Sequence, residues 1–297
     1  MAPTWKNPVH VAQWHSTLER YAFPVIGELR PAEVTTDHIL KILRPIWYEI
    51  TETAARLRGR LERTLDAARV LGLRDGENPA RWSGHLEMVL PAYNQVRKRG
   101  HHAAVHYDSM PEFFPRLQVH DGLGARALEL AVLTATRTSE VLHATWSEID
   151  LTDRSWTVPA ARMKAGAEHR VPLTEPALAL LRKLASLRTG EFIFPGQKAG
   201  QPLSNMAMRM VLKRTAGYDG ATPHGFRATF RTWAAEKTTH AFDVAEAALA
   251  HTQKDKTVAA YQRGDLFDKR RALMEDWASF CLSRPDSIID QTKCAAE

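Results

Sequence analysis

The sequence predicts a mainly α-helical protein: an all-helical domain followed by an α+β domain with one small antiparallel sheet. Three observations favour this fold class. A chain of 297 residues is comfortable for two domains. Apolar residues recur at helical spacing along most of its length. Only residues 146–173 gather Trp, Thr, Val and Ile in short runs beside turn-forming residues, which is typical of strands.

The N-terminal third is predicted to consist of helices. Residues 9–21 carry apolar side chains at helical spacing, and we expect Pro24 to interrupt that helix. The Thr-Thr-Asp sequence at residues 35–37 can cap a second helix at residues 38–48, with a break near Pro45.

A longer helix is expected at residues 51–71, where regularly spaced arginines stand beside leucines. Its arginines Arg56, Arg60 and Arg63 form either a solvated helix face or a face that contacts phosphates. An Asn-Pro pair at residues 78–79 marks the turn that follows.

Residues 97–110 are basic and rich in histidine, with apolar residues too sparse to pack. We therefore predict a helical domain at residues 1–100, a linker at 101–110, a second domain at 111–282 and a tail at 283–297. The histidines of the linker could suggest a metal site. No carboxylate or cysteine completes a recognised ligand spacing beside them, so we expect no metal there.

The second domain is predicted to be mainly helical, with the sheet inserted early. Helices are expected at residues 123–134 and 139–145, and short strands within 146–158 and 170–173. Pro176 lies in the first turn of a further helix. The remaining expected helices lie at residues 204–214, 225–237, 244–249, 255–261 and 266–282.

Composition and charge favour an intracellular protein with an anionic partner. The formal charge of +6 and the pI of about 9.4 are typical of nucleic-acid binding, although many basic proteins bind none. The two cysteines, Cys281 and Cys294, make neither a disulfide framework nor a metal-binding pair, which fits a reducing cytosol. The apolar runs are far too short for a bilayer span, and the first ten residues lack a secretion signal.

Arg137 lies at the join between two apolar helices. Such a setting costs a guanidinium group several kcal/mol of desolvation unless an anion accompanies it. Glu140 lies three residues on, on the same helical face, and could orient the arginine. This fragment alone favours an internal ion pair over a site for an external anion.

Lys164 is predicted at the tip of a two-stranded turn, from which its flexible stem can reach a neighbouring groove. Taken singly, an exposed hairpin lysine is nearly always just solvated. Lys183 and Lys198 are the alternatives if the hairpin is misplaced.

His224 and Arg227 lie three residues apart at a helix start, so both can face one point beside the terminal amides. This spacing favours an anion site over a capped helix with a surface arginine. His251 precedes Tyr261 by ten positions, and Tyr261 closes an alanine-rich helix. Taken alone, each of these last two is more often structural than catalytic.

Together these groups meet the needs of an attack on a phosphodiester. The reaction requires a nucleophile in line, stabilisation of charge on the non-bridging oxygens, and an acid for the departing oxygen. Two arginines can bind phosphate oxygens in bidentate fashion, which lysine does less well. A free phenol has a pKa near 10, so nearby cations and a histidine must assist it toward phenolate.

The order and surroundings of this series resemble the catalytic set of the tyrosine recombinases, the phage-type integrase family. The similarity is greatest to integrases of prophages and bacterial genomic islands. It is carried by segments 134–146, 162–173, 223–235 and 249–261, while segments 14–26 and 53–79 resemble the core-binding domain of that group. The resemblance therefore covers nearly the whole chain and implies the tyrosine recombinase catalytic fold after a helical core-binding domain.

The resemblance implies that Arg137 and Arg227 clamp the scissile phosphate, with Glu140 supporting Arg137. His224 and His251 would donate hydrogen bonds to the phosphoryl oxygens. His224 would also help to take the proton of the nucleophile.

The remaining implied roles concern bond making and breaking. Tyr261 would attack the phosphorus and stay joined to the 3′ phosphate, while Lys164 would act as general acid for the 5′ oxygen. A 5′ hydroxyl from another strand can then reverse the step. No nucleotide cofactor or metal ion is needed.

The implied function is site-specific integration or excision of a mobile element. Implied partners are double-stranded DNA attachment sites, further subunits in a homotetramer on paired sites, and DNA-bending accessory proteins, in the bacterial cytoplasm at the nucleoid. The alternatives are a type IB topoisomerase-like enzyme with the same chemistry and a catalytically silent DNA-binding protein derived from a recombinase.

Further expectations concern DNA contacts and assembly. The predicted helix at 266–282 either docks on a neighbouring subunit, as such elements often do in the family, or packs back in cis. The chain is expected to begin directly in the core-binding domain, without the arm-binding domain common in this group. Candidate DNA contacts are Arg209, Lys213, Arg214, Arg56 and Arg60.

Overall fold

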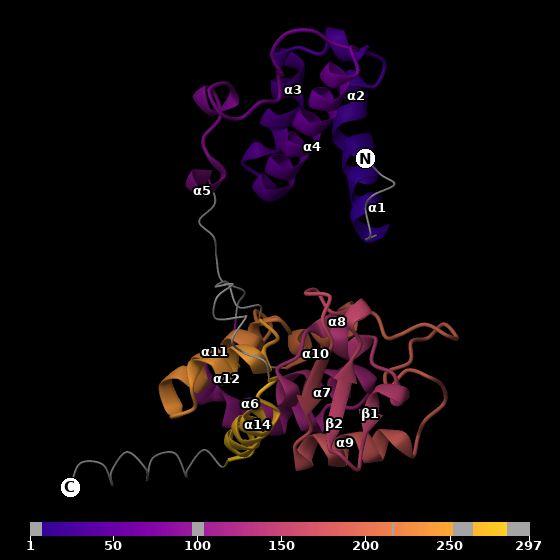
Figure 1. Cartoon of the computed structure of the whole chain (residues 1–297), viewed down its shortest axis with the longest axis vertical. Helices are drawn as coiled ribbons and strands as arrows, with labels where there is room; N and C mark the ends of the chain where they lie inside the picture. Colours follow the sequence, from indigo (N-terminus) through magenta and orange to yellow (C-terminus); the bar gives the residue numbers. More distant parts are fainter. Residues whose placement is uncertain (1–7, 97–103, 216, 252–263, 284–297) are drawn as a thin grey trace, which may run out of the picture. The chain divides into compact units, whose positions relative to one another are not determined.

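The computed structural model describes residues 8–96, 104–215, 217–251 and 264–283. Contacts divide the chain into two compact units, residues 1–100 and 101–297. The first unit is helical, and the second combines helices with a short sheet (Figure 1). None of the described helices has the length and apolar character needed to cross a membrane.

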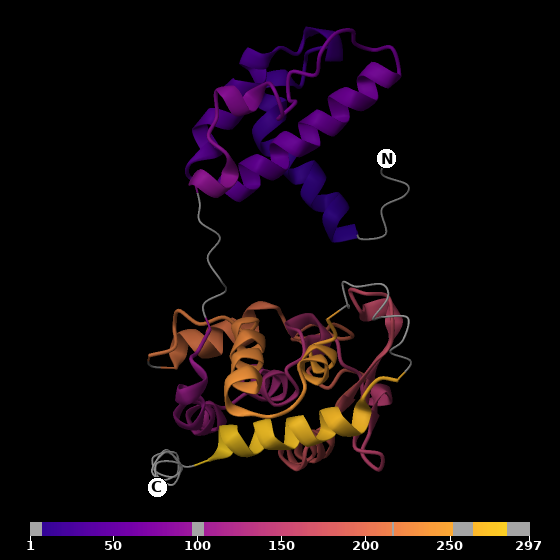
Figure 2. The same ribbon diagram turned by 60° about the vertical axis from the view of Figure 1, so that its left-hand side comes forward.

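The N-terminal unit is a group of helices around one apolar core (Figure 2). Helix α1 (Pro8–Thr17) passes through a π-helical turn at Leu18–Ala22 into α2 (Phe23–Ile26). Helix α3 (Thr36–Trp47) packs against α4 (Thr51–Val70). Short helical segments complete the unit at Pro31–Glu33, Leu86–Met88 and α5 (Tyr93–Val96).

Helix α3 starts at Thr36, two residues before the predicted start, because Thr35 forms the cap. The backbone N–H of Thr35 donates to Nδ1 of His38 at 3.2 Å, and its hydroxyl lies 3.2 Å from the same nitrogen. These bonds use side chains to satisfy polar groups that the first turn leaves without helical partners.

The predicted breaks at two prolines are wrong. Pro24 lies in the first turn of α2, where a missing N–H removes no helical hydrogen bond. Pro45 lies inside the last turn of α3 and forgoes one such bond. The helix nevertheless continues to Trp47, which is fully buried and donates its indole N–H to the carbonyl of Pro91 at 3.0 Å.

The structure places Arg60, a predicted candidate DNA contact, in the interior of the N-terminal unit. Its side chain is buried and donates to the backbone carbonyl of Gln13 at 2.6 Å and to the hydroxyl of Thr17. Burial, together with the charge of Arg56, lowers its pKa. Arg60 therefore ties α4 to α1, whereas Arg56 is exposed and pairs with Glu52 at 2.5 Å.

Helix α7 (Leu123–Thr134) is the central helix of the C-terminal unit, and almost all of its residues are buried. It packs against α6 (Met110–Val119), α9 (Glu175–Ala185), α10 (Met206–Arg214) and α14 (Phe267–Leu282). Because α7 is surrounded, its C-terminal end is held at a fixed place inside the unit, and the site described below begins there.

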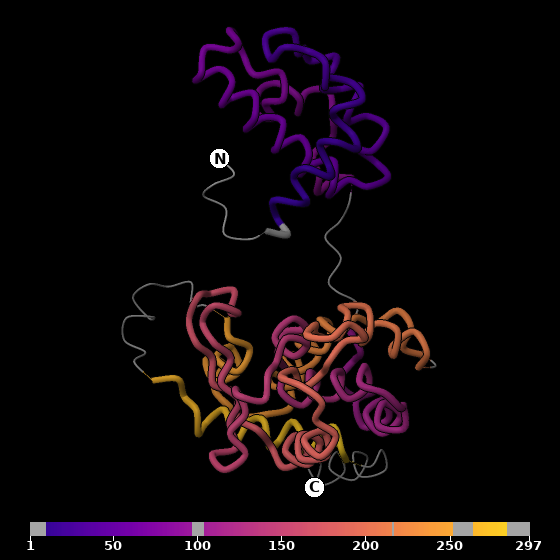
Figure 3. Tube along the Cα trace, turned by 90° about the vertical axis from the view of Figure 1, so that its right-hand side faces the viewer, coloured from indigo at the N-terminus to yellow at the C-terminus, as the bar shows by residue number. Residues whose placement is uncertain are grey.

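The sheet has three short antiparallel strands in the order β1 (Ile149–Asp150), β2 (Ser155–Val158) and β3 (His169–Pro172). Trp156 stands opposite Val171 in the register of β2 and β3. Figures 1 and 3 show the sheet on one side of this unit and α11 (Gly225–Lys237) on the other. The fold is thus mainly helical with a small antiparallel sheet, as predicted.

Helix α14 packs against its own unit, as the second of the two alternatives for the segment after Tyr261 describes. Its Trp277 is fully buried and donates the indole N–H to the carbonyl of Val132 in α7 at 2.8 Å. The ring of Trp277 also lies against Trp233 of α11, with centroids 4.9 Å apart. Figure 2 shows α14 as the long yellow helix along the C-terminal unit.

The expectation that the predicted linker does not pack is wrong for the part the structure describes. Val105, Tyr107 and Met110 are buried in the core of the C-terminal unit. The Tyr107 hydroxyl donates to Glu236 at 2.7 Å, which raises the pKa of this tyrosine to about 12. These few apolar side chains are enough to pack this segment because each one is buried against the core of the C-terminal unit.

His169 should make the C-terminal unit less stable in mild acid. Burial, with Arg270 nearby, lowers its pKa from 6.5 to about 4. The unfolded chain therefore takes up a proton below about pH 6.5 that the folded chain refuses until about pH 4. We expect a loss of about 3 kcal/mol of unfolding free energy as the pH falls through this window.

Urea unfolding at pH 7 and pH 4.5 tests this prediction. In the His169→Gln variant, the difference between the two pH values should shrink by about that amount. An unchanged difference would show that His169 is not responsible.

Candidate active site

The site begins where α7 ends and the chain turns sharply into α8 (Thr138–Leu142). Ala135 takes the left-handed conformation with φ of 51°, which stops α7. The hydroxyls of Thr134 and Thr136 lie 2.7 Å apart across this turn, and both side chains are buried. This turn places Arg137 at the N-terminal cap of α8.

Glu140 holds Arg137 through both of its carboxylate oxygens. One oxygen accepts from the Arg137 backbone N–H at 2.8 Å, and the other pairs with Nη1 at 2.7 Å. The Glu140 side chain is 2% exposed and that of Arg137 is 20% exposed. The predicted internal ion pair is therefore present, and it leaves part of the guanidinium group accessible.

Arg227 enters from the first turn of α11 and is buried. Its Nη1 donates to the carbonyl of Ala135 at 2.5 Å, and its Nη2 donates to the carbonyl of Leu249 at 2.6 Å. These carbonyls lie at the ends of α7 and α12 (Phe242–Ala248), where helices leave acceptors without helical partners. Burial, and next the charge of Arg137, lowers the pKa of Arg227 to about 10.

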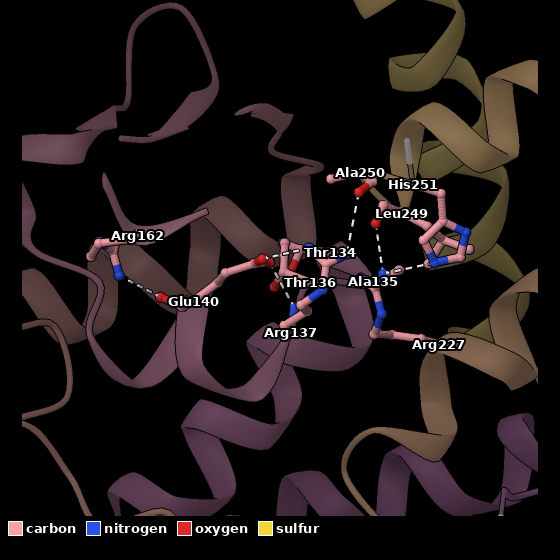
Figure 4. Close-up of polar contacts among 10 residues, drawn as sticks. All are labelled: Thr134, Ala135, Thr136, Arg137, Glu140, Arg162, Arg227, Leu249, Ala250 and His251. Atoms are coloured by element: carbon pink, nitrogen blue, oxygen red, sulfur yellow. Dashed lines mark hydrogen bonds and ion pairs between the residues drawn. The ribbon is translucent and has the colours of Figure 1, made fainter. Parts of the chain in front are cut away.

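The two arginines thus belong to one network. Arg137 donates Nη2 to the carbonyl of Ala250 at 3.2 Å, and Ala250 follows the carbonyl that Arg227 binds (Figure 4). Ala250 is left-handed, with φ of 48°, as is Ala135. Arg227 therefore contacts both of these helix ends and Arg137 contacts the second, so the two guanidinium groups converge on the same region.

His251 lies next to this pair. Its Nε2 is 3.3 Å from Nη2 of Arg227 (Figure 4). Its Nδ1 is 2.9 Å from the carboxylate of Glu246, which also accepts from Nε of Arg231 at 2.5 Å. Burial alone raises the pKa of Glu246, but the hydrogen bonds from His251 and Arg231 outweigh it and lower the pKa overall.

The loop between β2 and β3 is tied to the same region by Arg162. Its Nη1 donates to the carbonyl of Glu140 at 3.0 Å (Figure 4), and its Nη2 pairs with Glu148. Lys164 follows two residues later with an exposed side chain. The two alternatives for its role, Lys183 and Lys198, are exposed as well.

Of the predicted catalytic residues, the structure brings together Arg137, Arg227 and His251, with Glu140 behind the first. His224 is exposed at the N-terminal cap of α11, three residues before Arg227. Tyr261 lies outside the described residues.

Comparison with known protein families covers both units. Residues 1–85 match the model of the phage integrase central domain, and residues 116–265 match that of the phage integrase family. The second match includes every predicted catalytic residue and half of the chain.

The chain belongs to the phage integrase family.

Two relatives in this family come from Escherichia coli strain K12. The chain is 34% identical to prophage integrase IntA over 271 residues, which are 89% of this chain and 63% of the relative. It is 32% identical to prophage integrase IntZ over 272 residues, which are 91% of this chain and 65% of the relative. The chain thus spans somewhat less than two thirds of either relative's length.

Solved integrase structures share the fold. A lambda integrase dimer bound to a COC′ core site has a TM-score of 0.66 at 19% identity, covering 89% of this chain and 74% of that one. The Tn1549 transposon integrase in complex with circular intermediate DNA has a TM-score of 0.59 at 16% identity, covering 88% and 95%. At these identities the likeness concerns the fold alone.

Sequence reasoning missed several residues of this phage integrase family site. Glu246 and Arg231 contact His251 or its partner, and Arg162 fixes the loop that carries Lys164. A carboxylate five residues before His251, near a helix end, is the signal that could have indicated Glu246. No local signal indicates Arg162, because its partner Glu140 lies 22 residues away.

Proposed function

We propose that this chain cuts and rejoins DNA at specific sites through a covalent 3′-phosphotyrosyl intermediate on Tyr261. It would act as an integrase that inserts or excises a mobile element. The observation that supports the proposal most strongly is the convergence of Arg137, Arg227 and His251 in one network.

The charges of this network favour an anion. Glu140 compensates the charge of Arg137, whereas Arg227 binds two carbonyls and a histidine ring nitrogen among the described residues. A buried guanidinium group without a carboxylate is costly, as the lowered pKa of Arg227 indicates. A phosphate between the two arginines would remove that cost, and it would gain further as charge builds up in the transition state.

The proposed chemistry uses groups of the chain alone. The phenol oxygen of Tyr261 attacks phosphorus, and the bond from phosphorus to the 5′ oxygen breaks. Arg137 and Arg227 hold the non-bridging oxygens, while His224 and His251 donate hydrogen bonds to them. His224 helps to take the phenol proton, and Lys164 supplies the proton that the 5′ oxygen requires.

Lys164 is favoured over Lys183 and Lys198 because its loop is anchored beside the arginines. Arg162 binds the carbonyl of Glu140, the residue that positions Arg137. A flexible lysine two residues farther along can reach toward the phosphate that Arg137 holds.

DNA would be bound mainly through its phosphates. Arg209, Lys213 and Arg214 are exposed on α10, and Arg56 is exposed on α4, so all four can contact the backbone. Such binding should weaken steeply with salt. Paired attachment sites, a tetramer of this chain and DNA-bending accessory proteins complete the proposal.

A suicide substrate tests the proposal. We expect the chain to form a covalent adduct with nicked duplex that carries its core site, and the adduct should resist denaturant and form equally in a chelator. DNA retardation without an adduct would instead indicate a binding protein. Plasmid relaxation without sequence preference would indicate a topoisomerase-like enzyme.

A further inference from the structure

Glu246 uses its two carboxylate oxygens for two different partners. Oε1 accepts from Nε of Arg231 at 2.5 Å, and Oε2 lies 2.9 Å from Nδ1 of His251. The guanidinium group of Arg231 also stacks on the ring of Phe242, 4.3 Å from its centroid. Arg231 therefore holds one oxygen of Glu246, and the other oxygen fixes the orientation of the His251 ring.

The neighbours of His251 determine which ring nitrogen carries the proton. An arginine can only donate, so Nε2 of His251 accepts from Nη2 of Arg227 at 3.3 Å. An ionised carboxylate can only accept, so Nδ1 must carry the hydrogen that Glu246 receives. The resting ring is thus the Nδ1–H tautomer, with the Nε2 lone pair directed at Arg227.

We propose that Glu246 is a positioning residue for the cleavage reaction, fixing the orientation and protonation of His251 from the side opposite Arg227. The proposal rests on the proposed function, because it assumes that His251 faces the scissile phosphate. Since Glu246 keeps the Nδ1 hydrogen, His251 donates to a phosphoryl oxygen only when Nε2 also carries a proton taken from solvent.

The Glu246→Gln variant separates this role from simple packing. It keeps the size of the side chain but has only one accepting oxygen. Because Arg231 can only donate, the single amide oxygen stays hydrogen-bonded to Arg231. The amide NH₂ is then directed at Nδ1 of His251. Nδ1 then faces an amide donor while Nε2 still faces the N–H of Arg227, and a neutral ring has only one accepting nitrogen. The variant should therefore remove the bond that fixes the Nδ1–H tautomer.

Nitrogen-15 NMR of the histidine rings in the full chain reads the tautomer directly, without DNA. We expect the Nδ1–H pattern for His251 in the wild type and loss of that single pattern in Glu246→Gln, with the resonance assigned by its loss in His251→Asn. His240 is an internal control, because its Nε2 pairs with Asp276 at 2.7 Å and should not respond. An Nε2–H tautomer in the wild type, or an unchanged Nδ1–H pattern in the variant, would overturn the proposal.

Cleavage of the suicide substrate is the second measurement. The Glu246→Ala variant should lose about 10- to 100-fold in rate, the size typical when an orienting carboxylate behind a functional histidine is removed. Glu112→Ala is the matched control, because Glu112 is an exposed carboxylate that pairs with Arg116 at 2.5 Å. An unchanged cleavage rate in Glu246→Ala would refute the positioning role. A wild-type chain that forms no adduct would refute the proposed function, while the NMR result still reports on Glu246.

Discussion

Replacing Tyr261 with phenylalanine should abolish the covalent protein–DNA adduct completely. Phenylalanine lacks the oxygen that forms the ester with phosphorus, so no other part of the site can replace that bond. DNA retardation should stay within about twofold of the wild type, because affinity comes from many phosphate contacts and not from this hydroxyl. Denaturing gels of the suicide-substrate reaction measure the adduct, and native gels measure binding.

Tyr218→Phe is the matched control for this variant. Tyr218 loses the same hydroxyl, but its ring packs against Phe113 with centroids 4.8 Å apart. It should form the adduct at the wild-type rate. Adduct formation by Tyr261→Phe would assign the nucleophile to another residue and contradict the proposed mechanism.

The helices predicted best are those that local pattern alone determines. Helix α7 has the predicted bounds, since its apolar residues are broken only by Arg126 and Glu129 and Gly122 precedes its first turn. Helix α11 also has the predicted bounds, beginning after His224 and ending at Lys237. In both cases the residues that start and end the helix lie directly beside it in the sequence.

The failures have tertiary causes. Pro45 is a local signal for a helix break, but the burial of Trp47 keeps the chain helical beyond it. Arg60 stands among exposed arginines in the sequence, yet its partner Gln13 lies 47 residues away. Local spacing carries no information about such a partner, so a buried tie and a phosphate contact look the same in the sequence.

The candidate site also combines features that follow from local sequence with features that only the tertiary fold determines. The residue types and their order indicated Arg137, Arg227 and His251, because phosphodiester cleavage needs those groups. The carbonyls that hold the arginines were not predictable, since any residue has a carbonyl and only the fold chooses Ala135, Leu249 and Ala250. The side chains of the site could be proposed from the sequence, but their convergence depends on two helix ends.

Arg137→Lys should reduce the rate of cleavage by about 100- to 1,000-fold, the loss usual for one donor to a developing oxyanion. The present guanidinium group binds Glu140 through Nη1 and the carbonyl of Ala250 through Nη2. A lysine keeps the charge, but its single ammonium cannot span both partners and also hold phosphate in bidentate fashion. DNA retardation should change little, since one phosphate contact among many is altered and not removed.

Arg182→Lys controls for the substitution itself. Arg182 is exposed and pairs with Glu175 at 2.6 Å, and exposed pairs contribute little, so its cleavage rate should equal that of the wild type. Thermal unfolding of Arg137→Lys then distinguishes loss of phosphate binding from loss of folding. The folded state should persist, because Glu140 is buried and keeps a cationic partner. Near-normal cleavage by a folded Arg137→Lys would rule out the clamp.

The double variant with Arg227→Lys goes further, because it asks whether the two arginines act on one phosphate. Independent sites would multiply their losses. Groups that stabilise the same phosphate in the same step are strongly non-additive, since the second loss removes little once the first has displaced the phosphate. The double variant should therefore cleave faster than the product of the single losses predicts. Multiplicative losses would mean that Arg137 and Arg227, although joined through the ends of α7 and α12, serve different steps.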